Sequence, residues 1–304
     1  MKKEFRPAAL VNITNRCNLK CKHCFVFREG TPNKVTKKNE MPAQLMIKEL
    51  KKFRKKYGIL RMLWMGGEPL LRKDVLKLGM KLFFQNVITT NGTLPLINLG
   101  PKIKWVISLD GPEEINDEIR GKGCFSKVIN NLNNLPDNFN GDLQCNCVVT
   151  KKNENYLEEL IKILQKETPI RGVTFSFYVP KRNDMSDLGW KTLEERDLVI
   201  KNVIALKTKY PQYILNNMMI FEFMLSQTAL QFTNNCPVKK YMLPLYLGEV
   251  GFEQPFCCYG NDVNCDLCGA WAVFHLGAII KANPGWPEIV TGTFKRVTPT
   301  NISV

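Results

Sequence analysis

Residues 8–25 read AALVNITNRCNLKCKHCF, an apolar strand-like run that leads directly into three closely spaced cysteines. Cys17, Cys21 and Cys24 have the spacing C-x3-C-x2-C. Three thiolates on one short loop can hold three irons of a [4Fe–4S] cube and leave the fourth iron without a protein ligand. Because an iron with an open position can bind and reduce a small molecule, this stretch predicts a reactive site at the end of a strand.

A structural zinc site is the alternative for this loop, because short cysteine clusters often bind zinc through four closed ligands. His23 is the candidate for the fourth ligand. It lies between two of the cysteines, however, which makes a tetrahedral closure awkward. We therefore favour the iron–sulfur interpretation.

The 304-residue chain has 44% hydrophobic residues, as a globular protein does. Its length allows one large α/β domain with an appendage. No apolar run approaches the ~20 residues that cross a bilayer. Glu4, Arg6 and Asn12 interrupt any apolar core of a signal peptide. We therefore expect a cytoplasmic protein without a membrane span.

The net charge and the number of cysteines limit which partners and metals the protein can be expected to bind. A net charge of +15 favours acidic partners. The basic stretch KKFRKK at 51–56 is nevertheless typical of a solvated helix face, which disfavours nucleic acid. Eleven cysteines, an odd number, favour metal over disulfides in a reducing compartment.

Short apolar runs alternate with helical patterns up to about residue 180. This alternation predicts a parallel sheet with helices outside, either an open doubly wound sheet or a barrel. In both folds the ligand site lies at the carboxyl ends of the strands, where the motifs GGEP (66–69), TNG (90–92) and SLDGP (108–112) occur. The predicted strands are 8–14, 59–65, 87–90, 104–109, 143–149 and 172–178, and the predicted helices are 41–57, 73–84, 125–135 and 153–167.

The sequence changes character after residue 180. A polar connection at 181–192 precedes helical patterns at 193–209 and 216–232. The last 70 residues or so are rich in cysteine, glycine, proline and aromatics, so we expect a loop-rich module held by metal rather than regular helices. The segment 272–282, with Gly277 at its middle, reads as a hairpin with His275 on a strand.

The cysteine loop, MGGEP, TNGT and SLDGP, in this order on alternating strands, resemble the radical S-adenosylmethionine (SAM) enzymes. The resemblance covers roughly the first 180 residues. It implies a partial (β/α)6 TIM-like barrel at 1–190, followed at 191–304 by a helical segment and a cysteine-rich extension of the twitch or SPASM type.

The resemblance also implies roles for individual residues. Cys17, Cys21 and Cys24 would bind the catalytic [4Fe–4S] cluster, whose open iron chelates the amino and carboxylate groups of SAM. Arg120 would pair with the SAM carboxylate, and the backbone of Phe25 would lie near the adenine. The SAM amino group would contact Gly66, Gly67, Glu68 and Pro69, and the ribose or methionine moiety would contact Thr90, Asn91, Ser108 and Asp110.

Simpler interpretations stand beside these roles. GGEP and Asp110-Gly111-Pro112 can each be a plain turn. Arg120 can be an exposed arginine at a helix end, and Val148 and Val149 can pack in the core instead of on the adenine.

The chemistry that the resemblance implies is reductive. An electron from a reductase or ferredoxin-type donor cleaves SAM to methionine and a 5′-deoxyadenosyl radical, which takes a hydrogen atom from the substrate. The cofactor carries this chemistry, while the protein positions the reactants and excludes water.

The other cysteines form two groups. Cys124, Cys145 and Cys147 are expected to behave as small buried hydrophobes. The five thiols within 236–268 can close a four-ligand site, which the resemblance makes a second, auxiliary [4Fe–4S] cluster. Structural zinc is the alternative. The expected ligands are Cys236, Cys258, Cys265 and Cys268, with Cys257 as a replacement for Cys258.

The substrate is the open point, and it can be a small molecule or a peptide. The positive charge favours an anionic substrate, and the apolar stretch 216–232 is either a tunnel lining for an apolar chain or a buried helix. The absence of an extra N-terminal domain disfavours a leader-guided peptide maturase. A zinc-stabilised RNA-binding protein is the alternative of another class, but it leaves the placement of the motifs at strand ends without a reason.

Overall fold

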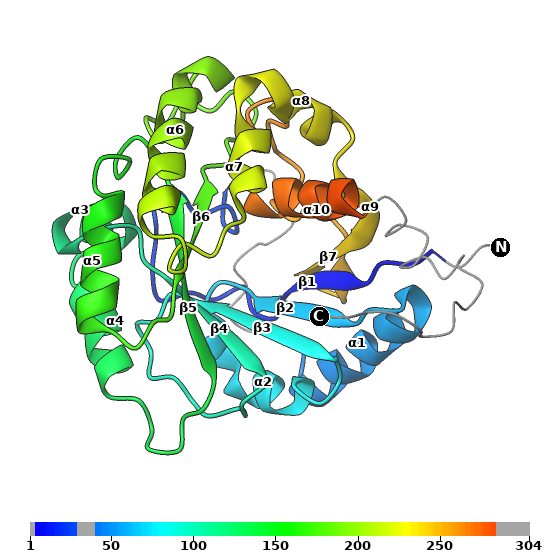
Figure 1. Cartoon of the computed structure of the whole chain (residues 1–304). Helices are drawn as coiled ribbons and strands as arrows, with labels where there is room; N and C mark the ends of the chain where they lie inside the picture. The colour runs from blue at the N-terminus through cyan, green and yellow to red at the C-terminus, as the bar shows by residue number, and fades with distance from the viewer. Residues whose placement is uncertain (1–3, 29–39, 284–304) are drawn as a thin grey trace, which may run out of the picture.

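The computed structural model describes residues 4–28 and 40–283, and these residues are built around an eight-stranded sheet (Figure 1). Neighbouring strands follow the order β6-β5-β4-β3-β2-β1-β7-β8. All neighbours are parallel except β7 and β8. The strands are β1 (Ala8–Asn12), β2 (Arg61–Met65), β3 (Gln85–Thr90), β4 (Ile103–Ser108), β5 (Asp142–Val149), β6 (Val173–Phe177), β7 (Met242–Leu247) and β8 (Phe252–Glu253).

The strand order decides between the two architectures that the sequence left open. β1 to β6 lie in the sheet in their order along the chain, without a reversal. A doubly wound sheet reverses and carries helices on both faces, whereas a barrel winds one way and keeps its crossover helices outside. The fold is therefore the predicted partial (β/α)6 barrel, extended by β7 beside β1.

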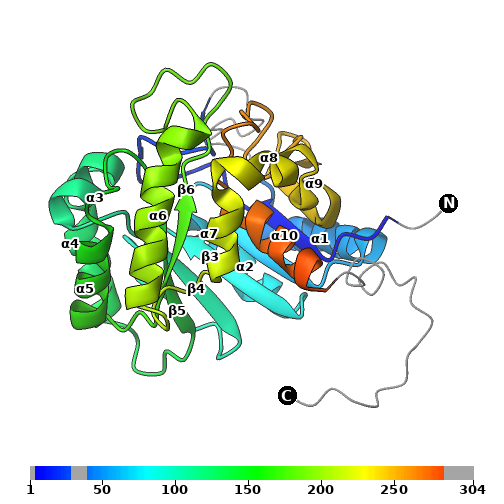
Figure 2. The ribbon, with the colours of Figure 1, turned by 45° about the horizontal axis from the view of Figure 1, so that its top comes forward.

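The outer face of the sheet packs against the crossover helices. The ring of Trp64 in β2 lies 5.9 Å from that of Phe83, and a Cβ atom at Gly79 would come within 2.3 Å of it. Because side chains alternate along a strand, Arg61 in β2 points to the opposite, inner face. Figures 1 and 2 show α10 on this inner side and α1 and α2 on the outer side.

The helices near the N-terminus agree with the predicted ones within a few residues, with two exceptions. The predicted helix 73–84 ends at Gly79, and α3 had not been predicted as an element of its own. Up to β6 the helices are α1 (Ala43–Tyr57), the 3-10 helix η1 (Pro69–Arg72), α2 (Lys73–Gly79), α3 (Glu113–Arg120), α4 (Cys124–Asn133) and α5 (Leu157–Glu167).

The predicted helix 193–209 is confirmed as α6, but the pattern at 216–232 forms two helices. The break falls at Leu225, where the carboxylate of Asp197 accepts bonds from Ser226 N at 2.8 Å and Ser226 Oγ at 2.6 Å. Four residues of α7 are buried, as in a core helix. After β6 the helices are α6 (Leu193–Lys209), α7 (Met218–Met224), α8 (Ser226–Asn234), α9 (Pro237–Tyr241) and α10 (Trp271–Ala282).

The expectation of a hairpin at 272–282 was wrong, because this segment is the helix α10, with His275 on it. Gly277 is not a turn residue. A Cβ atom there would lie 2.5 Å from the ring of Phe232 in α8, so the glycine allows two helices to pack closely. The segment is apolar on most sides, and its helical period is therefore hard to see in the sequence.

The last part of the described chain also completes the sheet. β7 had been read as irregular chain, and Pro244 within it obscured the strand pattern, yet Pro244 pairs with Leu10 of β1. The division of the chain at residue 190 stays a prediction, and residues 284–304 of its second unit lie outside the described residues. No helix among the described residues is long and apolar enough to cross a membrane.

Candidate active site

The cysteine loop leaves the carboxyl end of β1 and rests on the glycines that follow β2. Gly67 N donates to Thr14 O at 2.9 Å, and Glu68 N donates to Arg16 O at 2.8 Å. A Cβ atom at Gly67 would lie only 2.0 Å from Arg16 O and 2.9 Å from Cys17 N. The glycine is therefore required where the backbone of the cysteine loop crosses the end of β2.

Replacing Gly67 with alanine is expected to push this loop away from the sheet. The new methyl group would overlap a backbone carbonyl, which cannot rotate away as a side chain can. We expect a loss of about 1–3 kcal/mol of unfolding free energy and a lower iron content after anaerobic reconstitution. Chemical unfolding and iron analysis test this, with Gly251→Ala, where a Cβ atom meets nothing within 4 Å, as the control. Equal iron content and stability in the two variants would contradict the assigned role.

Glu68 ties the end of β2 to the end of β3. Its buried carboxylate accepts bonds from Leu70 N at 2.9 Å, Thr90 Oγ1 at 2.7 Å and Asn91 N at 2.8 Å. Burial raises the pKa of Glu68, and these hydrogen bonds oppose the shift. Pro69 begins the short helix η1 behind it and is also buried. The carboxylate thus has three partners within the protein, which sequence reasoning had not foreseen.

Asn91 reaches from the end of β3 to the cysteine loop. Its Nδ2 donates to Asn18 Oδ1 at 2.9 Å and lies 3.8 Å from Cys17 Sγ as a second donor contact. Leu19 N also donates to Cys17 Sγ, at 3.4 Å. Donors aimed at a cysteine sulfur stabilise a thiolate, which is the form that binds iron.

The three cysteines of the loop are partly exposed and electrostatically coupled to one another. Burial raises the pKa of Cys21 to about 12, and the nearby Arg120 guanidinium acts in the opposite direction. Burial raises the pKa of Cys17 as well, and metal coordination deprotonates such thiols outright. Their chemistry and their exposure fit three ligands of an iron–sulfur cluster.

A buried charged group lies directly beside this loop. Asp110 is fully buried, and its Oδ2 lies 2.7 Å from both His23 Nε2 and Arg120 Nε. Its Oδ1 accepts a bond from Val148 N at 2.9 Å. Burial opposes the charge, but Arg120 and then His23 hold the pKa of Asp110 well below its usual range.

This ion group differs from what the sequence predicted for Arg120 and His23. Arg120 is buried rather than exposed at a helix end, and His23 had been given no role beyond the loop. Ser108 lies at the end of β4 with 9% of its surface exposed, near the others but outside the ion group. No local pattern links His23 to Asp110, which is 87 residues away, so the sequence offered no signal for this pairing.

The cysteine loop also contacts the C-terminal part of the chain. The ring of Phe25 lies 4.6 Å from that of Tyr259, which directly follows Cys257 and Cys258. Arg28 donates to Val179 O at 2.8 Å and to Tyr259 O at 2.9 Å. The two cysteine-rich regions therefore meet through an aromatic pair and an arginine.

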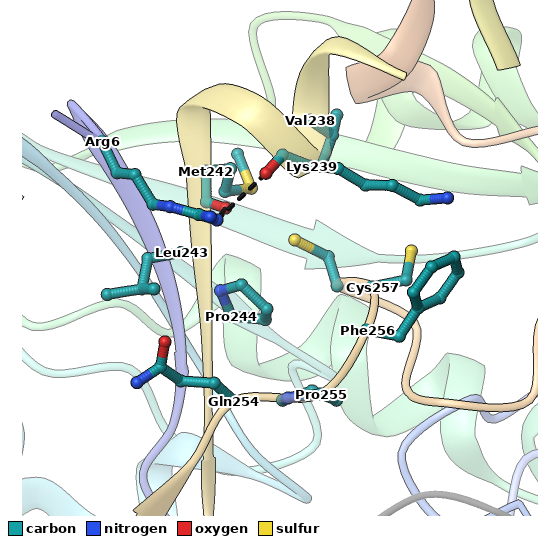
Figure 3. Close-up of a pocket in the computed structure, with 11 residues that line it drawn as sticks. Arg6, Val238, Lys239, Met242, Leu243, Pro244, Gln254, Pro255, Phe256 and Cys257 are labelled. Carbon is teal, nitrogen blue, oxygen red and sulfur yellow. Dashed lines mark hydrogen bonds between the residues drawn. The ribbon is translucent and has the colours of Figure 1, made fainter. Parts of the chain in front are cut away.

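The five C-terminal cysteines line one cavity together with apolar residues of α9 and α10. Burial raises the pKa of Cys257, and the charges of Cys236 and Cys265 add to this shift. A second cavity of about 200 Å³ lies next to it, between Arg6, Lys239 and the segment 254–258 (Figure 3). Lys239 Nζ contacts Cys265 Sγ at 3.8 Å and lies 3.7 Å from the centre of the Phe256 ring.

Within residues 4–28 and 40–283, no three cysteine, histidine or acidic side chains surround a single point closely enough to hold one metal ion. The middle group, Cys124, Cys145 and Cys147, is buried as predicted. Burial raises the pKa of each of these three thiols.

Comparison with known proteins identifies the class. The sequence pattern of the Radical SAM superfamily matches residues 11–164, just over half of the chain. Fe-coproporphyrin III synthase of Methanosarcina barkeri is 34% identical over 148 residues, which cover 44% of this chain and 35% of that protein. This chain therefore spans about a third of the length of that relative.

Two solved structures share the fold. Streptococcus suis SuiB bound to precursor peptide SuiA has a TM-score of 0.62 at 16% identity, covering 89% of this chain and 65% of that one. Native anSMEcpe with bound AdoMet (SAM) has a TM-score of 0.62 at 18% identity, covering 88% and 80%. The chain belongs to the radical SAM superfamily, whose members are enzymes that use a [4Fe–4S] cluster and SAM.

Proposed function

We propose that this chain reductively cleaves SAM at a cluster held by Cys17, Cys21 and Cys24 and directs the resulting radical to a hydrogen atom of its substrate. The observation that carries the proposal is the placement of these thiols. Their loop follows β1 and rests on Gly67 after β2, and Cys17 accepts a donor contact from Asn91 after β3. When bound, the cluster supplies the electron that splits SAM into methionine and the 5′-deoxyadenosyl radical.

The residues around the cysteines divide into two groups in this proposal. The backbone of Gly66, Gly67 and Phe25 and the side chain of Ser108 are the contacts offered to SAM. Glu68, Asp110 and Arg120 are engaged within the protein and hold the strand ends in place. Pro69, Thr90 and Asn91 shape the same edge, where Asn91 orients Cys17.

The test is an anaerobic assay on the full chain reconstituted with iron and sulfide. With SAM and dithionite, we expect 5′-deoxyadenosine by mass spectrometry and about four irons per cluster, or about eight for two clusters. Protein that takes up only zinc, forms no 5′-deoxyadenosine and binds RNA in a salt-sensitive manner would overturn the proposal in favour of an RNA-binding protein.

The substrate in this proposal is a small acidic molecule, and a peptide is the second candidate. The net charge of +15 favours the first. The likeness in fold to SuiB, whose structure holds a precursor peptide, supports the second. Incubation with deuterated acidic metabolites or peptides, followed by transfer of deuterium to 5′-deoxyadenosine, separates the two. The reducing cytoplasm, with a ferredoxin-type or reductase donor, suits eleven free thiols.

We further propose that the C-terminal cysteines hold an auxiliary [4Fe–4S] cluster through Cys236, Cys257, Cys265 and Cys268. After burial, the largest contributions to the raised pKa of Cys257 and Cys268 include other members of this set. After burial, the largest contributions to the raised pKa of Cys258 come from Cys257 and Cys236 and not from Cys265 or Cys268, and Arg6 acts in the opposite direction. This favours Cys257 over the Cys258 ligand that the sequence had led us to expect.

Serine replacement at two adjacent positions tests the ligand set. Cys257→Ser is expected to lower the iron content from about eight to about four, because three thiolates hold a cube poorly. Cys258→Ser changes the same atom one residue away and is expected to keep both clusters. The reverse result would make Cys258 the ligand, and full iron in both variants would argue against a cluster at this site.

A further inference from the structure

We propose that the inner face of the sheet carries an anion subsite, formed by Arg61 and Lys104 together with Trp271 and His275 of α10. It would bind a carboxylate or phosphate group of the substrate. The inference rests on the proposed function for the identity of its ligand. The site itself consists of two half-buried cations beside buried polar atoms that lack hydrogen-bond partners.

Strand pairing places the two cations on one face. Arg61 pairs with Gln85 of β3, and Lys104 of β4 pairs with Val87 of the same strand. Trp64 and Trp105 are fully buried on the outer face. Each lies an odd number of residues after the cation on its own strand, so Arg61 and Lys104 point to the inner face. β2 and β4 are roughly 10 Å apart with β3 between them, a gap that two long side chains can span.

Both cations lack a counterion within the described part of the chain. Arg61 Nε is buried without a hydrogen-bond partner, and neither Arg61 nor Lys104 has a carboxylate within 4.0 Å. Asp142 pairs with Lys104 across β4 and β5. Burial lowers the pKa of Lys104 and the charge of Asp142 raises it, but Asp142 Oδ1 already lies 2.7 Å from Arg171 Nε. Burial lowers the pKa of Arg61, as expected for a cation removed from water without a partner.

Helix α10 covers the same place with two more groups. Trp271 and His275 stack with ring centres 4.4 Å apart. Trp271 Nε1 is buried without a partner. His275 is close enough to both cations that, after burial, Arg61 and Lys104 help lower its pKa to about 4. The helix therefore adds a donor to the two cations and no acid.

A further polar group without a partner lies on this face. Asn12 of β1 is 0% exposed, and neither its Nδ2 nor its Oδ1 has a hydrogen-bond partner. It shares the inner face with Arg61, because Ala8 pairs with Arg61 and Asn12 lies two alternations further along β1. Buried polar groups are almost always paired in native proteins. Arg61 Nε and Trp271 Nε1, both without partners beside a second cation, indicate a missing ligand with acceptor oxygens and negative charge. Asn12 lies roughly 13 Å further along the same face, toward the cysteine loop.

The position of the subsite fits one end of a substrate. Arg61 begins β2, and the GGEP motif follows its last residue, so the cations lie roughly 15–20 Å along the strand from the cysteine loop. An acidic group held here would leave the rest of an elongated molecule lying along the inner face toward the site of radical formation. Charge neutralisation would at the same time lower the cost of holding two half-buried cations side by side.

Anion titrations of the full chain test the subsite, with citrate and inorganic phosphate as probes at constant ionic strength. We expect a saturable rise in melting temperature with citrate. Arg61→Met and Lys104→Met should each weaken the apparent affinity by at least about ten-fold. Lys102→Met removes one positive charge from an exposed position two residues away and should leave the affinity unchanged. A response to citrate but not to phosphate would identify an organic acid as the ligand, and an equal response would identify the acid group alone.

A second measurement does not depend on binding. Without citrate, Arg61→Met should melt at a higher temperature than the wild type, because an apolar side chain replaces a half-buried cation whose buried Nε has no partner. Equal citrate affinities in wild type, Arg61→Met and Lys102→Met, or no saturable effect in any of them, would overturn the inference. Citrate binding needs neither SAM nor an electron, so the two proposals can fail separately. SAM cleavage without an anion effect would contradict only the subsite. An anion effect without SAM cleavage would contradict only the proposed function.

Discussion

Replacing Cys21 with alanine is expected to lower 5′-deoxyadenosine formation by roughly three orders of magnitude or more, as for a group on which the whole reaction depends. Two thiolates, Cys17 and Cys24, would remain to hold the cluster. The described neighbours do not replace the missing sulfur, because Asn91 and Leu19 offer only donors to Cys17 and His23 Nε2 is engaged with Asp110 at 2.7 Å. The measurement is iron content and SAM cleavage in the reconstituted variant.

Cys145→Ala is the matched control for this experiment. Cys145 is a buried cysteine in β5, where its Sγ contacts Leu109 O at 3.8 Å, and it loses the same atom in the substitution. We expect it to lose about 1 kcal/mol of stability and to keep its iron and its activity. If Cys21→Ala retained a full cluster and turnover, the catalytic ligands would have to be sought elsewhere in the chain.

The placement of the cysteine loop was accessible from the sequence because it depends on local patterns. Short apolar runs marked the strands. The glycines of MGGEP were expected to contact SAM, and the packing of Gly67 against the backbone of Arg16 was not foreseen. Parallel strands deliver their carboxyl ends to one edge, so three motifs far apart in the chain were expected to meet there. What periodicity could not decide was a barrel against a doubly wound sheet, because only the strand pairing shows that the winding never reverses.

Other features depend on contacts that no local pattern records. The residues read as candidate SAM contacts include Asp110 and Arg120, which the structure pairs with each other and with His23. The helix α10 was missed because Gly277 looks like a turn until Phe232 is seen against it. The Phe25–Tyr259 contact joins two loops whose cysteines had been treated as separate groups. Each of these depends on residues distant in sequence.

Replacing Asp110 with asparagine is expected to lower the unfolding free energy by about 3–5 kcal/mol, the cost of leaving a buried charge without its partner. The two side chains have nearly the same shape, so no cavity forms. Arg120, with 6% of its surface exposed, would keep its charge and lose its counterion, and His23 would lose its carboxylate acceptor. Urea unfolding of the two proteins at pH 7 gives the difference.

The pH dependence of this difference has a definite sign. Because the pKa of Asp110 is lowered in the folded state, the ionised carboxylate contributes stability above its usual pKa in the unfolded chain, about 3.9. That contribution is lost as the pH falls from there toward the lower folded value. The gap between wild type and Asp110→Asn should therefore be full at pH 7 and narrow below about pH 4.

Asp187→Asn provides the comparison that isolates burial. Asp187 Oδ2 also lies 2.7 Å from a cation, Lys152, but its side chain is 73% exposed. Water screens this pair, so its loss should cost at most about 1 kcal/mol. Adding Arg120→Met to Asp110→Asn should recover part of the lost stability, since it removes the unpaired buried cation. If Asp110→Asn were no more destabilising than Asp187→Asn, the ion group would not hold the cysteine loop. The role of Asp110 would then be the contact with SAM that the sequence predicted.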